Sequence, residues 1–468
     1  MAIPSIRCGL LAAAVLVATL TVDPGNAAKR GPAKGEAQTQ ARGAPVADYP
    51  SSIRRPRGIY AVVVVNETRG ADKVDFDALV SNAAVSGLAI RTFWSSLQPA
   101  KDRYDFSQLD AAFASAEAKH KTIQLILVPG FGTPAWVLGE IPSCDDVTTV
   151  PAATSERGTR PHGGRAKAAG GGAEAAKAGA ANCGKASFTV SEGKAHGEKQ
   201  ELPLPWNPVY KRYWKAFLTE VAARYGKRDT LVSIAVAGPT AESVEIILPR
   251  AGDQLERWGE LLQLFYRDPS YRQSDKAFVD EWDAAVTMYG ELFRNVTIVL
   301  TRGSGLPTFS RGQGRSAQAA IVSSFAAHAV GTNAKATQTS GMKACRETEG
   351  GIKGVKELSQ SASYAPPMLG GAQFDTSFSQ KPATEGCKAS CDAEAPACRG
   401  VTPAQALNNV LSVYFDGTPV GDQYGASKGA VRMNYLQIYE KDIRFASTQP
   451  EVQAALEQAS RQLLMQAR

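Results

Sequence analysis

The stretch VSIAVAGPTAESVEI, residues 232–246, begins as small and β-branched residues and ends with two glutamates, Glu242 and Glu245, beyond a Gly-Pro break. A short apolar run bounded by such a break is typical of a strand that is buried on both faces. Two interpretations remain open beyond the break. The glutamates lie either in a loop at the end of the strand, or in the first turns of a helix that Thr240 caps.

The rest of the chain places this strand in a repeated pattern. Strand-like runs occur at 58–65, 88–94, 123–130, 231–238, 295–301, 333–342, 368–375 and 432–439, and the clearest helical patterns lie at 106–119, 207–225, 275–293, 318–329, 402–415 and 450–467. Strands that alternate with helices predict a parallel sheet, and eight such units predict a (β/α)8 TIM barrel. The alternative, a doubly wound open sheet, requires a glycine-rich phosphate loop after a strand, and the sequence has none.

The segments outside this strand and helix pattern indicate the domain organisation. Residues 1–28 combine Arg7, an apolar run over 9–22 and small residues up to Ala27 or Ala28, which predicts a cleaved secretory signal peptide and a secreted or periplasmic protein. A retained membrane anchor is the alternative, but the run is short. We expect a flexible linker over 29–56 and the barrel over 57–468, with 145–200 as a low-complexity inserted loop.

Six cysteines remain once the signal peptide is removed, and an even number in an exported chain predicts up to three disulfides. A bridge between Cys144 and Cys183 would make the insertion a stapled loop, and a bridge from Cys345 to Cys387 or Cys391 would stiffen the rim of the barrel; Cys398 is the sixth candidate. The C-x3-C spacing of 387–391 fits neither a redox motif nor the usual zinc site, so we expect no metal.

The net charge of +7 is concentrated in two segments. Residues 28–45 hold four basic and one acidic residue, and residues 151–200 hold eight basic and four acidic residues. Because this basic excess lies in linker-like sequence, we expect no nucleic-acid partner.

Four motifs carry a resemblance to a known family. They are RTFWSSLQPAKDRYDFSQLD (91–110), PGFGTPAW (129–136), LPWNP (204–208) and ARYGKRD (223–229). Together, over roughly 58–300, they resemble the clan A glycoside hydrolases, which include β-galactosidase-like and endoglucanase-like enzymes. The resemblance implies a retaining glycosidase without a cofactor, with an acid/base carboxylate after strand four and a nucleophile after strand seven.

The sequence departs from this family at the end of strand four, where Ala237-Gly238-Pro239 replaces the usual Asn-Glu. Because side chains alternate along a strand, Ser233, Ala235 and Ala237 are expected to face the lumen, so the usual acid position holds no carboxylate. Glu242, in the following loop, is therefore the first candidate for the acid/base, and Glu245 is the second.

Candidates for the second carboxylate follow strands seven and eight. Asp375 shares the parity of Gln373 and is the first candidate; Glu440 directly follows strand eight, and Asp442 is a weaker candidate. Each of them is alternatively a solvated loop acid.

Side chains that suit a sugar gather at the predicted strand ends. Aromatic faces stack on sugar rings while polar groups bind the hydroxyls, so we expect substrate contacts from Arg91, Trp94, Phe131, Trp136, Gln373, Gln437 and Tyr439. The alternative is that the aromatic residues close the top of the core.

The sequence thus predicts an exported glycoside hydrolase that cleaves a polysaccharide or oligosaccharide with two carboxylates. A carbohydrate-binding barrel that has lost its catalytic pair is the alternative. A lyase or esterase barrel is less well supported, since no G-x-S-x-G motif is present.

Overall fold

The computed structural model describes residues 51–65, 74–145, 183–190, 195–250, 252–266, 271, 276–307, 314–328, 333–342, 357–358, 360–361, 363–364, 367–374, 402, 404, 407–408, 411 and 433–466. Residues 1–42 and 43–468 form separate units, and all described residues belong to the second. The predicted signal peptide and most of the predicted linker lie outside the described residues.

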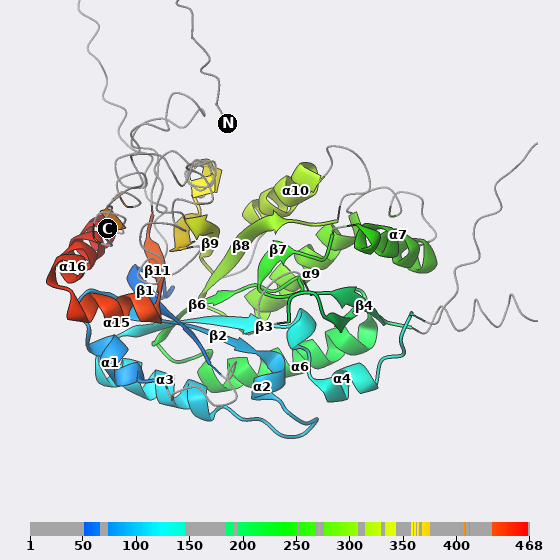
Figure 1. Cartoon of the computed structure of the whole chain (residues 1–468), viewed down its shortest axis with the longest axis horizontal. Helices are drawn as coiled ribbons and strands as arrows, with labels where there is room; N and C mark the ends of the chain where they lie inside the picture. Colours follow the sequence, from blue (N-terminus) through cyan, green and yellow to red (C-terminus); the bar gives the residue numbers. More distant parts are fainter. Residues whose placement is uncertain are drawn as a thin grey trace, which may run out of the picture. The chain divides into compact units, whose positions relative to one another are not determined.

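Eight parallel strands close into a barrel (Figure 1). They are β1 (Gly58–Val64), β2 (Val85–Phe93), β3 (Thr122–Val128), β6 (Leu231–Ala235), β8 (Thr297–Gly305), β9 (Lys335–Met342), β10 (Leu369–Phe374) and β11 (Tyr435–Tyr439). Their order around the barrel follows the chain, and the β11–β1 and β6–β8 pairings complete the circle. The predicted (β/α)8 fold is confirmed, with each of the eight strand-like runs in the wall.

Helices surround the barrel, and they include those predicted at 106–119, 207–225, 275–293, 318–329 and 450–467. They are α1 (Phe76–Ser81), α2 (Trp94–Leu97), α3 (Ser107–Ala118), α4 (Ala135–Gly139), α6 (Pro208–Tyr225), α7 (Asp253–Phe265), α9 (Lys276–Leu292), α10 (Gly314–Ala327), α15 (Glu440–Thr448) and α16 (Pro450–Gln466). Local sequence fixes their starts: the Asn207 side chain accepts a hydrogen bond from the Tyr210 amide, and Pro208 opens α6. Within the predicted helix 402–415, residues 404, 407, 408 and 411 are helical.

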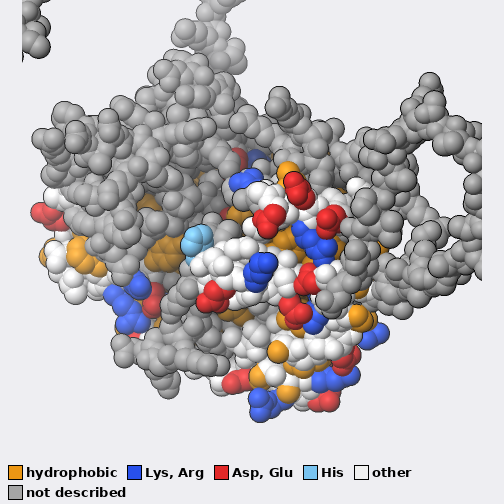
Figure 2. Space-filling model, turned by 45° about the vertical axis from the view of Figure 1, so that its right-hand side comes forward, with side chains coloured by type: hydrophobic (Ala, Val, Ile, Leu, Met, Phe, Trp, Pro, Cys, Tyr) orange, Lys and Arg blue, Asp and Glu red, His pale blue; other side chains and the backbone are white. Residues whose placement is uncertain are grey.

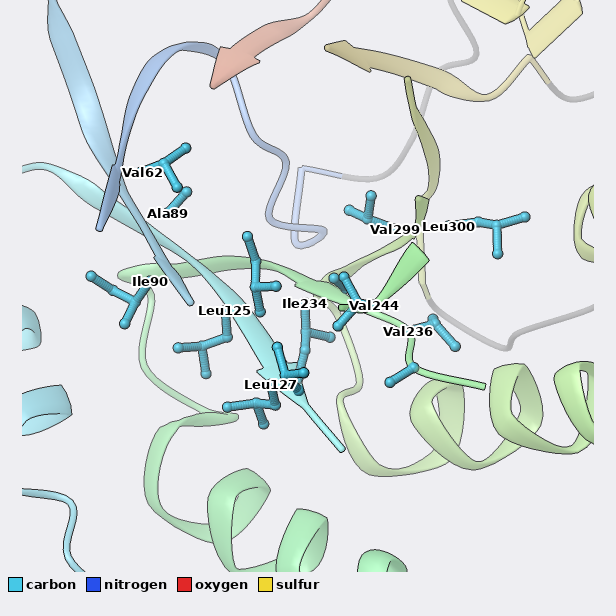
Figure 3. Packing of buried hydrophobic residues seen from close by; sticks show 14 of the residues in the cluster. Val62, Ala89, Ile90, Leu125, Leu127, Ile234, Val236, Val244, Val299 and Leu300 are labelled. Carbon is cyan, nitrogen blue, oxygen red and sulfur yellow. The ribbon is translucent and has the colours of Figure 1, made fainter. Parts of the chain in front are cut away.

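The wall is apolar on its helix-facing side. Leu125, Leu127 and Ile234 are completely buried, and Figure 3 shows these side chains of β3 and β6 lying together. Strands covered on both sides read as nearly continuous apolar runs, which is why the sequence pattern located them.

Two tyrosines fill one level of the lumen. The rings of Tyr60 and Tyr435 meet edge to face at 6.2 Å between centroids, and both side chains are buried. A Cβ atom added at Gly87 would overlap the Tyr60 ring, and one added at Gly371 would overlap the Tyr435 ring. The glycine that interrupts the apolar pattern of strand seven is therefore needed to make room for Tyr435.

Four glutamines form a second level, which we call the lumen amide network: Gln124, Gln338, Gln373 and Gln437. Gln437 donates to Gln124 at 2.7 Å, and Gln338 donates to Gln437 at 3.1 Å and to Gln373 at 3.2 Å. The Tyr435 hydroxyl also donates to Gln338 at 3.0 Å. These side chains come from β3, β9, β10 and β11, so the network crosses the lumen from wall to wall.

The lysine that interrupts the sixth strand has a structural role. Lys335 is buried, and its Nζ donates to the carbonyl oxygens of Ala326 and His328 at the end of α10. Cations favour helix C-termini because the last carbonyl groups lack partners within the helix. Burial lowers the pKa of Lys335.

The insertion after strand three is partly structured. Cys144 and Cys183 form the predicted disulfide, with their Cα atoms 5.0 Å apart. Beyond it, β4 (Lys185–Thr189) and β5 (Lys199–Pro203) pair as an antiparallel hairpin. The Phe188 ring stacks on Trp258 of α7, with 4.5 Å between the ring centroids. The inserted loop was predicted to extend through residue 200, but packed structure begins soon after Cys183. The candidates Cys345, Cys387, Cys391 and Cys398 lie outside the described residues.

Acidic and basic side chains are interspersed on the face that Figure 2 shows, with apolar side chains between them. Among the described helices, none is both long enough and apolar enough to cross a bilayer.

Candidate functional site

Strand four is interrupted and then resumes. The wall segment β6 ends at Ala235, residues 236–244 leave the wall, and the chain returns as β7 (Glu245–Ile247). Both segments pair with the same neighbour, since β6 pairs with the Thr297 end of β8 and β7 with its Gly305 end. We call residues 236–244 the strand-four loop, and β7 continues strand four beyond it.

The helix interpretation of this segment is wrong. The Thr240 hydroxyl donates to the backbone carbonyl of Glu245 at 2.8 Å and so closes the strand-four loop instead of capping a helix. Ser and Thr side chains favour turns and helix caps alike, which explains the ambiguity. The β-branched pair Ile246-Ile247 favours the strand that forms.

Contacts with strands two and three hold the strand-four loop in place. Arg91 Nη2, at the end of β2, donates to the backbone carbonyl of Glu242 at 2.8 Å. The Phe131 amide, just beyond β3, donates to the carbonyl of Ala241, also at 2.8 Å. Gly130 has a φ of +66°, and a Cβ atom there would overlap the loop backbone. The loop that carries Glu242 is therefore fixed against the carboxyl ends of two neighbouring strands, where a barrel of this type has its site.

Glu245 lies on the lumen side of the resumed strand. Its register partner is Thr301, whose own partner on β9 is Gln338 of the lumen amide network. Residues in register on parallel strands point to the same face. The Cβ position of Gly303 also lies 3.0 Å from the Glu245 Cβ, so a glycine leaves room beside this carboxylate. In the sequence, the β-branched residues on both sides of Glu245 are the feature that indicates a strand there.

The candidates for the second carboxylate have different environments. Glu440 is the first residue of α15, and its carboxylate pairs with Arg444 at 3.2 Å. Asp442, in the same turn, is completely buried. Asp375 lies outside the described residues, so its place remains a prediction.

Two predicted substrate-binding residues contact each other at the mouth. Gln373 Nε2 donates to the Tyr439 hydroxyl at 3.3 Å, and both side chains are half-buried. Gln373 also accepts the hydrogen bond from Gln338, which connects this pair to the lumen amide network. Gln437, in contrast, is 2% exposed and bonded within the lumen, so its predicted contact with a substrate is corrected to a structural role.

The predicted aromatic contacts divide between core and mouth. Trp94 has no exposed surface: its Nε1 donates to Gln98 at 2.9 Å, and its ring lies 5.1 Å from Trp214. Its predicted role in sugar stacking is therefore wrong and the alternative role in the core applies, because Trp214 and Phe217 of α6 pack on its ring. Trp136 is half-buried and lies edge to face with Tyr213 at 5.0 Å. Phe131 is also half-buried and belongs to the segment that holds the strand-four loop.

The motifs that carried the resemblance build much of the scaffold. We call Asp110, Glu117, Arg224, Tyr225 and Arg228 the outer carboxylate cluster. Asp110 accepts from Arg224 Nε at 2.9 Å and from the Tyr225 hydroxyl at 2.8 Å, and Glu117 accepts from Arg228 at 2.7 and 2.9 Å. These contacts hold α3 against α6 and against the residues that follow it.

The outer carboxylate cluster lowers the pKa of both acids. Burial opposes this effect for Asp110, but hydrogen bonds from Arg224 and Tyr225 outweigh it. The hydrogen bond from Arg228 is the main cause for Glu117.

Comparisons with known proteins agree with these motifs. The β-galactosidase family model, glycoside hydrolase family 42, matches residues 73–168. The chain is similar to xylanase 10B from Thermotoga petrophila RKU-1, with 10% identity, a TM-score of 0.40 and coverage of 82% of each chain. It is also similar to the β-galactosidase from Rahnella sp. R3, with 11% identity, a TM-score of 0.43 and coverage of 90% of this chain and 58% of that chain. No curated protein matches. The family model covers the segment that holds strands two and three, and there the chain resembles the clan A glycoside hydrolases.

Proposed function

We propose that this protein is an exported glycoside hydrolase that cleaves a polysaccharide or oligosaccharide. The observation that carries the proposal is the fixed strand-four loop, in which Arg91 binds the backbone carbonyl of Glu242 while Glu245 lies on the resumed strand. Both glutamates belong to the segment at the end of the barrel where this fold has its site, which supports a catalytic role for one of them despite the missing Asn-Glu.

The chemistry requires two carboxylates with different tasks. One protonates the leaving oxygen, and we assign this step to Glu242 or Glu245. The other attacks the sugar or activates water, and Glu440 and Asp375 are the candidates. A separation of about 5–5.5 Å between the two carboxyl groups would give retention, and about 6.5–9.5 Å would give inversion. The sugar would contact five of the predicted substrate-binding residues: Arg91, Phe131, Trp136, Gln373 and Tyr439.

The test measures the release of reducing ends from a panel of plant and bacterial polysaccharides. Glu242→Gln and Glu245→Gln are compared with wild type, and Glu256→Gln, an exposed glutamate on α7, is the matched control. Removal of a general acid lowers the rate by about 10²–10⁴-fold. We expect such a loss in one of the two strand-four variants and wild-type rates in the control.

Wild-type rates in both strand-four variants would contradict the proposal. Glu440→Gln tests the second carboxylate in the same assay, and a loss there would favour Glu440 over Asp375. Sequencing the N-terminus of the secreted protein tests export, for which we expect cleavage near Ala27 or Ala28.

A carbohydrate-binding barrel without catalysis is the second candidate. Two observations favour it: Ala237 occupies the usual acid position, and Arg444 already pairs with Glu440. This candidate predicts that wild type binds oligosaccharides but releases no reducing ends, and that Glu242→Gln binds them as tightly as wild type.

A further inference from the structure

A pocket lies between α6 and α9, and none of the residues assigned to catalysis lines it. Its walls come from both helices, from the segment before α6 and from the start of the strand-four loop. The lining residues are Pro203, Pro205, Tyr210, Lys211, Trp214, Ala237, Gly238, Pro239, Thr240, Glu281, Ala284, Ala285 and Met288. The space open to the centres of water molecules is about 70 Å³.

This volume indicates how large a bound molecule the pocket can hold. One water needs roughly 10–15 Å³ by this measure and takes about 30 Å³ of liquid, so the pocket holds about five to seven waters. The same number of waters corresponds to roughly 150–200 Å³ of ligand, which is the size of a single sugar ring.

One ion pair supplies the charged groups of the pocket. Lys211 Nζ donates to Glu281 at 2.7 Å, and the two side chains are 43% and 16% exposed. Burial raises the pKa of Glu281, although the hydrogen bond from Lys211 opposes this shift. Within the described part of the chain, Lys211 is the only hydrogen-bond partner of Glu281. A carboxylate has room for about four hydrogen bonds and an ammonium donates three, so both groups can bond further partners.

The remaining walls are apolar or backbone. Met288 is half-buried and Trp214 is 3% exposed, so Met288 and a small part of the Trp214 indole form the apolar wall, and three prolines also line the pocket. The paired charges cancel, so the pocket favours a neutral ligand over an ion. Hydroxyl groups satisfy both charged partners at once, because a hydroxyl donates to the carboxylate and accepts from the ammonium. An apolar wall beside such polar groups also suits the apolar C–H face of a sugar.

We propose that the pocket between α6 and α9 is a second binding site, distinct from the barrel mouth, which takes one neutral polyhydroxylated ring such as a monosaccharide unit. Glu281 and Lys211 bind its hydroxyl groups, and the ring lies against the apolar wall.

Occupancy of this site is coupled to the strand-four loop. Gly238, Pro239 and Thr240 line the pocket and belong to the same loop that carries Glu242. A ligand that contacts one conformation of this loop stabilises that conformation, and the effect on affinity is reciprocal between the two sites. Bound sugar is therefore expected to slow amide hydrogen exchange over 238–244.

The test titrates the full chain with D-glucose, D-galactose, D-xylose and glycerol and monitors tryptophan fluorescence, because Trp214 lines the pocket. Ala284 is exposed on α9, so Ala284→Phe blocks the pocket without disturbing the core. Thr287→Phe is the matched control, since Thr287 is exposed on the same helix and does not line the pocket. Glu281→Gln removes the charged acceptor.

We expect at least one of the sugars to bind wild type, with wild-type affinity in Thr287→Phe and no binding in Ala284→Phe. Loss of a hydrogen bond to a charged group corresponds to an affinity about tenfold lower or more in Glu281→Gln. The proposal is overturned if none of the probes binds wild type, or if Ala284→Phe and Glu281→Gln both bind like wild type. Titrating Glu242→Gln as well separates this result from the proposed catalysis, because pocket binding should persist in that variant.

Discussion

The outer carboxylate cluster and the lumen amide network are both polar, but they differ in charge and in exposure to water. The outer cluster uses full charges on side chains that stay partly in water, such as Arg224 at 50% exposed and Asp110 at 36%. The lumen network uses neutral amides that are almost completely buried, such as Gln124 and Gln437 at 2% each. Burying a charge is costly unless it is paired, whereas a buried amide needs only hydrogen-bond partners.

This difference predicts how each network responds to damage. A buried donor or acceptor that loses its partner carries the full cost of its lost hydration. An exposed ion pair that is broken is replaced by water and counterions. The lumen network is therefore expected to be sensitive to single substitutions, and the outer cluster to be tolerant of them.

Gln437→Leu should have the largest effect on stability. The substitution leaves Gln124 Oε1 without the donor it has now, in a lumen that water cannot reach. An unpaired buried group costs about 1–3 kcal/mol in the free energy of unfolding. Urea denaturation measures the change, with Gln263→Leu, an exposed glutamine on α7, as the control. Equal stability of the two variants would show that the lumen network does not hold the barrel together.

Asp110→Asn should have a smaller effect. The amide keeps an acceptor for Tyr225 but loses the ion pair with Arg224. Exposed ion pairs contribute about 0.2–1 kcal/mol, and salt screens them further. Denaturation at low and high salt measures the difference between wild type and variant, which should shrink as salt rises. A loss as large as that of Gln437→Leu would remove the distinction between the two networks.

The smallest expected effect is the pH dependence of the free energy of unfolding, which should differ between the two networks. The pKa values of Asp110 and Glu117 are lowered in the folded protein, so the unfolded chain takes up protons first as the pH falls. The stability that these acids contribute is present above the usual carboxyl pKa of about 4 and is lost below it. The effect of Asp110→Asn should therefore vanish in acid, while that of Gln437→Leu should not depend on pH. Unfolding curves over this pH range test both statements.

Sequence periodicity located the barrel because it reports which face of a strand is covered. Gln373, Gln437 and Tyr439 were predicted to face inward, and their hydrogen bonds across the lumen agree. Periodicity does not report how deep along the barrel axis a residue lies. For this reason Gln437 was predicted at the mouth but lies in the closed lumen, and Trp94 was predicted on a sugar but lies in the core.

The strand-four segment could not be predicted for a different reason. Its Thr and Ser residues favour a helix cap as much as a turn, and the pairing partner that decides between them, β8, lies about 55 residues later in the chain. The motifs near strands two and three were recognised because they resemble a known family pattern, although the contacts between them are distant in sequence: Asp110 and Arg224, for example, are 114 residues apart. The sequence thus predicted the scaffold better than the site that the scaffold supports.

The return of strand four to the same neighbour makes residues 236–244 an insertion within a single strand. The wall is sealed below this segment by β6–β8 pairing and above it by β7–β8 pairing. The alignment of the other strands therefore does not depend on this loop, but its composition is constrained, because Val236, Ala237, Ala241 and Val244 are buried in the core. Changes that reshape the entrance while the barrel stays constant are expected at the half-buried Glu242 and Ser243.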